Sequence, residues 1–201
     1  MAKSFFNPQN SLWHWIGKLP ELIILSFLWG ICSLPVLTLI PASIALYDAV
    51  ARNLRPDEKG LYRRFLRTFW KELGRGVLLS LFWLVLAFFF ATGYRVVTTQ
   101  SPGTAQALIY QVSMLLPIGV FLWEIPLESR FFYGFWTLQK TAVQVFLSFL
   151  PYSVLMLAIT ALGLVGCFYV PVLTVIMPAL LALLNSLIIE KVFSKLTREE
   201  E

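Results

Sequence analysis

Five long apolar runs, separated by short segments that hold most of the charged residues, constrain what this chain can fold into. The runs cover residues 22–40, 77–94, 107–123, 143–164 and 168–189. A helix that crosses the hydrocarbon core of a bilayer needs about 20 mostly apolar residues, and each run is close to that length. Strands of a membrane barrel are only about ten residues long and alternate in polarity, so they do not fit these runs. We therefore predict an all-α fold, a polytopic membrane helical bundle with five transmembrane helices.

The composition supports a membrane protein of one domain. Of the 201 residues, 58% are hydrophobic and only 13% are charged. A soluble domain carries about 25% charged residues, so this chain could not cover a surface that faces water. Its length is typical of one domain, and we expect residues 1–201 to form a single membrane domain. Residues 1–21 are expected to form an interfacial segment and residues 190–201 a tail.

Prolines fall inside or beside three of the predicted spans. A proline inside a helix removes one backbone hydrogen bond and crowds the preceding turn, so we expect the helices to kink at these positions. The prolines are Pro35, Pro41, Pro151, Pro171 and Pro178. The last two spans are separated by only a few residues around Gly163, Gly166 and Cys167, which predicts a tight antiparallel hairpin there.

The basic residues are distributed unevenly around the predicted spans. Thirteen of the sixteen Lys and Arg residues lie on one side of the bundle, and the other side holds only Lys3, Lys18 and Arg95. Connections rich in Lys and Arg stay in the cytoplasm. We therefore expect the C-terminus and two basic connections to be cytoplasmic and the N-terminus to lie outside. The two connections are residues 51–76 and 124–142.

The first connection contains a basic aromatic heptad, "RFLRTFW", at residues 64–70. Between Leu61 and Leu73 the apolar residues recur at helical spacing and the basic residues fall on the opposite face. Such a helix lies in the headgroup plane and binds anionic lipid, so we expect a separate amphipathic cytoplasmic elbow helix. The residues expected to contact lipid or a partner are Arg63, Arg64, Arg67, Trp70, Lys71 and Arg75.

Two other partners fit a basic aromatic segment. Nucleic acid is not expected, because the cytoplasmic location explains the charge and the aromatic residues share the apolar stripe. Docking of a cytoplasmic or membrane protein is compatible with lipid binding, since one helix can do both.

A second heptad, "RFFYGFW", occupies residues 130–136, at a constant offset of 66 from the first. It shares the Arg, the first Phe, and the Phe-Trp pair with the first heptad. We predict a second elbow over residues 124–142, with Arg130 and Trp136 as further contact residues. The two elbows would belong to a two-fold parallel internal repeat, although chance matches among abundant Phe residues are the alternative.

No motif of the sequence points to catalysis. The chain has no H-E-x-x-H, no G-x-S-x-G and no glycine-rich phosphate loop. No Asp, Glu, Lys or Arg lies deep within a predicted span, where an ionisable group usually marks ion or proton transport. We therefore expect neither an enzyme nor a bound cofactor or metal ion.

A few polar residues near the ends of the spans are expected to be structural. Asp48 and Glu124 are predicted to pair with Arg64 and Arg130 and to hold the elbows against the bundle. The simpler alternative is that these acids pair at the interface with whichever Arg lies nearby. Asn185, in the last span, is expected to form an interhelical hydrogen bond.

The stretch "SLPVLTLIPASIALYDAVARNLR" (33–55) resembles the signature of the YesL family, small bacterial membrane proteins of unknown function. The matching residues are Pro35, Thr38, Pro41, Ala42, Ala45, Leu46 and Tyr47. Residues 125–142, including Pro126, resemble the second common stretch of the family. The resemblance implies a bacterial plasma membrane and an accessory role in sugar uptake or sensing. It predicts structural roles for Pro35, Pro41, Tyr47 and Pro126, in addition to the structural roles expected above for Asp48, Glu124 and Asn185.

We therefore expect a non-enzymatic membrane accessory or scaffold protein that docks a sugar transporter or sensor complex through its basic elbows. Anionic lipid is the second expected partner, and a homo-oligomer is compatible with the sequence. The alternative is a small transporter or channel component that moves a solute through the bundle. A transporter requires a continuous polar cavity, whereas a scaffold is packed solid.

Overall fold

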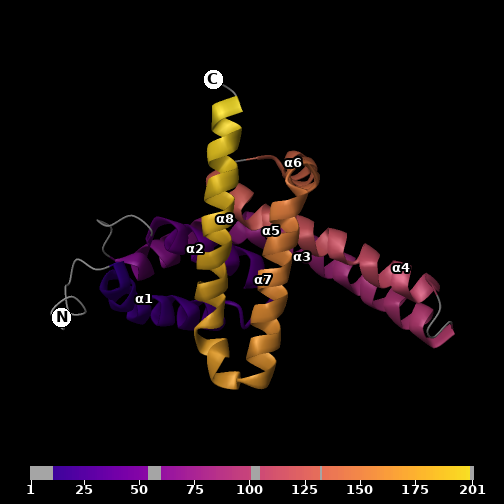
Figure 1. Ribbon diagram of the computed structural model, residues 1–201, viewed down its shortest axis with the longest axis horizontal. Helices are drawn as coiled ribbons and strands as arrows, with labels where there is room; N and C mark the ends of the chain where they lie inside the picture. The colour runs from indigo at the N-terminus through magenta and orange to yellow at the C-terminus, as the bar shows by residue number, and fades with distance from the viewer. Residues whose placement is uncertain (1–10, 54–59, 101–104, 132, 200–201) are drawn as a thin grey trace, which may run out of the picture.

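The computed structural model describes residues 11–53, 60–100, 105–131 and 133–199, and these residues form helices and turns with no strand among them. This confirms the all-α fold. The elements are α1 (Ser11–Cys32), η1 (Val36–Thr38), α2 (Leu39–Asn53), α3 (Leu61–Gln100), α4 (Ala105–Ser113), α5 (Leu115–Arg130), α6 (Phe135–Ser148), α7 (Leu150–Tyr169), η2 (Pro171–Val175) and α8 (Met177–Glu199). Figure 1 shows α3 and α4 extending away from the other helices, while α7 and α8 run side by side across that direction.

Within the described ranges, three helical stretches are long and apolar enough to cross a membrane. They are Leu61–Thr99, Ala105–Arg130 and Leu150–Tyr169. Many of their large apolar side chains are exposed, among them Phe88 (75%) and Phe89 (70%). Apolar surface of this extent is what a protein presents to lipid. The structure thus agrees with a membrane protein, whereas the five predicted spans are not all confirmed.

The first predicted span, residues 22–40, is not one helix. The α1 helix ends at Cys32, and Pro35 precedes the short helix η1. The Thr38 hydroxyl donates to the carbonyl groups of Cys32 (2.6 Å) and Pro35 (2.7 Å) and so closes the turn. Proline disfavours helical backbone at the residue before it, so Pro35 ends the helix instead of kinking it.

As a result, α1 and α2 form an antiparallel hairpin. The Trp29 Nε1–H donates to the Ser43 hydroxyl at 3.1 Å across the hairpin. Farther from the turn, Leu22 and Leu25 belong to the same buried cluster as Leu46 and Val50. The beginning of α1 and the end of α2 therefore lie at the same end of the hairpin.

Most of the residues that resemble the YesL signature form the buried face of α2, while Pro35 and Thr38 lie in the turn before it. Ala42, Ala45, Leu46 and Tyr47 are each at most 4% exposed. The alanines leave room for close approach of other helices, and α2 contacts α1, α3, α5 and α8. This helix is therefore the centre of the described fold, with the basic segment of α3 packed along it.

The first elbow is not a separate helix. Residues 61–76 are the beginning of α3, which continues without a break for 40 residues. The second predicted elbow, in contrast, is divided: α5 ends at Arg130 and α6 begins after Gly134. The first heptad is thus entirely helical and the second crosses a helix boundary, so the described structure does not confirm the predicted repeat.

The last hairpin turns later than predicted. The chain reverses through Val170 and η2, and both Gly163 and Gly166 lie inside α7. A glycine inside an apolar helix lets a neighbouring helix approach, and here the Leu181 side chain packs against Gly163. The predicted spans 143–164 and 168–189 are therefore shifted, since α6 ends at Ser148 and α7 covers 150–169.

Most of the prolines begin helices instead of kinking them. A proline in the first turn costs nothing, because the N–H groups there have no partner within the helix. This is the position of Pro151 in α7, Pro171 in η2, Pro178 in α8 and Pro41 in α2.

Candidate functional site

The basic segment at the start of α3 is held to the protein by its aromatic residues. Leu61, Phe65 and Phe69 are at most 7% exposed and pack in the cluster that α2 provides. Tyr62 (47%) and Trp70 (68%) remain at the surface. The apolar stripe that was predicted to face lipid is therefore divided. The residues at its centre pack in the protein core, and only those at its edge are exposed to lipid or a partner.

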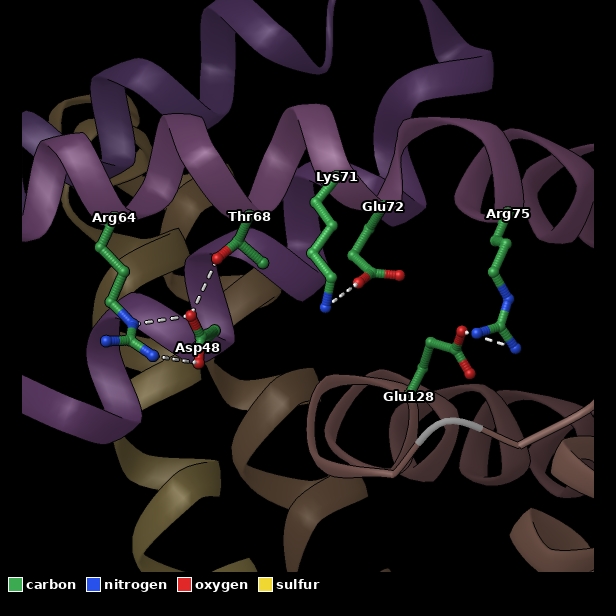
Figure 2. Close-up of polar contacts among 7 residues, drawn as sticks. All are labelled: Asp48, Arg64, Thr68, Lys71, Glu72, Arg75 and Glu128. Atoms are coloured by element: carbon green, nitrogen blue, oxygen red, sulfur yellow. Dashed lines mark hydrogen bonds and ion pairs between the residues drawn. The ribbon is translucent and has the colours of Figure 1, made fainter.

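Asp48 of α2 joins this segment to the core. Arg64 Nε donates to Asp48 Oδ2 at 2.8 Å, and the Thr68 hydroxyl donates to the same oxygen at 2.9 Å (Figure 2). The side chains of Arg64 and Asp48 are 29% and 12% exposed. The ion pair predicted from the sequence is thus present, with a hydroxyl from the next turn as a second donor.

Replacing Asp48 by Ala is expected to lower the unfolding free energy by about 1–2 kcal/mol, since it removes charge-assisted hydrogen bonds from a partly buried site. The start of α3 should loosen from α2 and become a better protease substrate in proteoliposomes. Unchanged protease protection would show that Asp48 does not hold this segment.

Two carboxylates, one on α3 and one on α5, are almost fully buried. Glu72 and Glu128 are 4% and 3% exposed. Lys71 Nζ lies 3.3 Å from Glu72 Oε1, and Arg75 Nη2 lies 3.2 Å from Glu128 Oε1 (Figure 2). Arg75 also donates to the carbonyl oxygen of Tyr133, between α5 and α6. The Arg75 guanidinium thus connects α3 to α5 and to the segment between α5 and α6.

Arg130 and Glu124 do not form the predicted pair. Arg130, the last residue of α5, forms an ion pair with Glu190 of α8, and its guanidinium lies 4.9 Å from the centre of the Phe193 ring. Glu124 is buried and accepts a hydrogen bond from Trp83 Nε1 at 2.5 Å. The two residues are almost two helical turns apart in α5, so each bonds to a different helix.

A polar cavity of about 560 Å³ opens between these groups, and we call it the basic cleft. It is lined by Ile44, Asp48, Arg63, Arg64, Arg67, Thr68, Lys71, Glu72, Ser129 and Arg130. Five of these side chains are cationic and two are carboxylates, so the cleft is positive overall. Its chemistry suits binding of an anion, because guanidinium groups bind carboxylates and phosphates through paired hydrogen bonds.

Of the residues predicted to contact lipid or a partner, five line the basic cleft and three lie outside it. Arg75 is engaged by Glu128 and Tyr133, one turn beyond the cleft. Trp70 and Trp136 are 68% and 72% exposed on α3 and α6.

The residues predicted to be structural are mostly buried. Pro41, Tyr47 and Pro126 are inside, and Asn185 Nδ2 donates to Thr160 Oγ1 at 3.4 Å, the interhelical bond expected. Burial, reinforced by the nearby Glu190 carboxylate, raises the pKa of the Tyr47 phenol well above its ordinary value. The phenol is therefore a neutral hydroxyl.

Glu72 and Glu190 were missed by the sequence analysis. For Glu72 a signal existed: it follows Phe65 and Phe69 at the spacing that keeps residues on one helix face, which is the buried face. Glu190 had no such signal, because its pairing with Arg130 depends on how α5 and α8 pack. Among the described residues, no group of His, Cys, Asp and Glu could hold a metal ion.

Comparison with known protein families gives a match to part of the chain. Residues 22–94 match the family model described as "Protein of unknown function, DUF624". The match includes the α1–α2 turn, α2 and the basic segment of α3, and it is compatible with the resemblance to the YesL family. No curated protein and no solved structure matches the chain.

Proposed function

We propose that this protein is a non-enzymatic accessory or scaffold protein of a bacterial plasma membrane, which docks an acidic segment of a partner protein in the basic cleft. The observation that carries the proposal is the cleft itself, a cavity of about 560 Å³ with five cations from α3 and α5 against two carboxylates. A cavity with an excess of positive charge favours a negatively charged partner.

The cations of the cleft differ in how firmly they are held. Arg64 and Arg130 are fixed by carboxylates of other helices, whereas Arg63 and Arg67 line the cleft as exposed side chains. A pair held by ion pairs beside two exposed cations suits recognition of an extended acidic segment. The fixed pair would set the position of the segment, and the exposed pair would add attraction that depends on salt.

We further propose a topology that differs from the sequence-based one. Since α1 and α2 form a hairpin, both of its ends would lie on the cytoplasmic side, and the membrane would be crossed by α3, by α4 with α5, by α7 and by α8. Both termini would then be cytoplasmic. Fifteen of the sixteen Lys and Arg residues would lie on that side, with only Arg95 outside. This distribution is more one-sided than the five-span arrangement gives.

A link to carbohydrate uptake or sugar-responsive signalling remains part of the proposal and rests on the resemblance to the YesL family. The described helices enclose cavities and so are not packed solid as expected of a scaffold, but the transporter alternative has less support. A path for a sugar needs many polar groups along its walls, but two cavities between the helices have apolar walls. One of these contains Trp83, Phe90 and Phe121, and the other contains Trp29, Ile125 and Leu164.

A crosslinking experiment tests the docking proposal. A photoreactive amino acid replaces Trp70, which is exposed beside the cleft, and the full-length protein is irradiated in native membranes. We expect a discrete adduct with one membrane or cytoplasmic protein of an uptake or sensing system. The double variant Arg63→Glu/Arg67→Glu should lower the adduct yield about tenfold or more, because it reverses the attraction.

The matched control is Lys140→Glu, which reverses an exposed cation on α6 away from the cleft. It should leave the yield unchanged. Capture of lipid alone, or a protein adduct that the double variant does not reduce, would overturn the docking proposal and leave simple membrane anchoring.

A further inference from the structure

A second cavity, of about 320 Å³, lies where α1, α2, α5, α7 and α8 meet. Its apolar walls include Trp29, Ile125, Leu164 and Leu181, and none of its lining residues is charged. The volume falls in the range of small-molecule binding sites, roughly 300–1,000 Å³. Such sites are mostly apolar and contain a few polar groups that fix the orientation of the ligand.

Two polar atoms in the walls lack a partner. The Tyr47 hydroxyl and Asn185 Oδ1 are buried, and neither forms a hydrogen bond with any described residue. Tyr47 is 4% exposed, so bulk water does not solvate its hydroxyl. Asn185 already uses its amide nitrogen on Thr160, which leaves the oxygen as a free acceptor. Buried polar groups are nearly always bonded, so this pair points to a ligand group between the helices.

We propose that this cavity binds a neutral, lipid-class molecule that consists of a long hydrocarbon with one hydroxyl group. The hydroxyl donates to Asn185 Oδ1 and accepts from the Tyr47 O–H, and so it satisfies both atoms at once. A charged ligand does not fit, because no lining residue carries the opposite charge. A sugar does not fit either, because most of its hydroxyl groups would face apolar walls.

The position of the cavity gives such a ligand a route from the bilayer. Leu164, at one end, is 64% exposed, and the neighbouring Phe168 is 84% exposed. The other end, at Tyr47 and Ile189, is buried beside the layer of ion pairs that includes Asp48. The hydrocarbon would enter from the apolar surface of the α7–α8 hairpin, with its hydroxyl towards the charged layer. This inference does not depend on the docking proposed for the basic cleft.

The test uses two matched photoreactive probes, a sixteen-carbon alcohol with a diazirine in the chain and the methyl ether of the same alcohol. The full-length protein is irradiated with each probe in phosphatidylcholine nanodiscs, and labelled peptides are identified by mass spectrometry. We expect labels on the cavity walls of α7 and α8, and about tenfold more from the alcohol than from the ether, which is the ratio that one ordinary hydrogen bond gives.

Variants separate the cavity from the outer surface. The double change Tyr47→Phe/Asn185→Leu keeps the approximate size of both side chains, and it should make the two probes label equally. Ala182→Trp fills the cavity and should abolish wall labelling while labels on the exposed α7 surface persist. The control Tyr62→Phe removes an exposed hydroxyl on α3 and should change nothing.

Equal labelling of the wild type by alcohol and ether would overturn the proposal, and water or unspecific acyl chains would then occupy the cavity. The same conclusion follows if the double variant keeps the tenfold preference. If Ala182→Trp fails to fold, the double variant still decides the outcome, because it adds no volume.

Discussion

An alanine at Gly76 is expected to lower the unfolding free energy by about 1–3 kcal/mol, the usual cost of overpacking a core. A Cβ atom at Gly76 would lie 2.7 Å from Pro41 Cβ and 2.8 Å from Pro41 Cδ. The pyrrolidine ring cannot rotate away, and Pro41 is fully buried in the first turn of α2. The clash can therefore be relieved only if α2 and α3 separate, and this separation disturbs the central contact of the fold.

The matched control lies two residues earlier in the same helix. An alanine Cβ at Gly74 would meet no atom within 4 Å. Alanine is the better helix former by about 1 kcal/mol, so Gly74→Ala should leave stability unchanged or raise it by up to that amount. The measurement is the unfolding free energy of the purified variants in mixed detergent micelles. Shifts of both variants in the same direction would show that contact with Pro41 does not decide the effect.

The features that were predicted correctly depend on local sequence. The helical class follows from apolar runs that are too long for strands, and three stretches in the described ranges are long and apolar enough to cross a membrane. The pair of Asp48 and Arg64 was also predictable, since the two residues flank one short connection. A short connection keeps its two ends close in space, so few other residues compete with Arg64 for the Asp48 carboxylate.

The features that were predicted wrongly depend on packing or on turn geometry. Hydropathy cannot distinguish a continuous span at 22–40 from a helix that ends at Cys32 and turns before Pro35, because it depends only on the apolar composition, which is the same in both cases. The partners of Glu124 and Arg130 belong to α3 and α8 respectively. Those contacts exist only after distant helices have packed, so proximity in sequence suggested the wrong pair.

The resemblance to the YesL family was most informative for residues that pack between helices. The signature residues 35–47 include the α1–α2 turn and the buried face of α2. Their spacing, with Ala42, Ala45 and Leu46 three and four residues apart, is that of a helix face that other helices approach closely. In physical terms the signature specifies the turn and the buried face of the central hairpin.

Replacing Arg75 by Met is expected to lower the unfolding free energy by about 2–3 kcal/mol, below the usual cost of breaking a fully buried pair because Arg75 itself is partly exposed. The side chain of Glu128 is 1% exposed and that of Arg75 is 45% exposed. Without the guanidinium, the buried carboxylate would lose its ion pair at 3.2 Å, and the attraction of Lys71 would remain. The carbonyl of Tyr133 would also lose its donor.

A double-mutant cycle separates the ion pair from the loss of packing. In Arg75→Met/Glu128→Met the two costs should fall short of additivity by about 1–2 kcal/mol, since the second change removes the charge that the first leaves unpaired. Arg63→Met, which removes an exposed cation from the same helix, should change stability by less than about 0.5 kcal/mol. Strict additivity in the cycle would mean that Arg75 stabilises the fold through its bond to Tyr133 and its methylene groups alone. A coupling of the expected size would instead establish that the buried Glu128 requires its cation, and that α3 and α5 are held together by charge as well as by apolar contact.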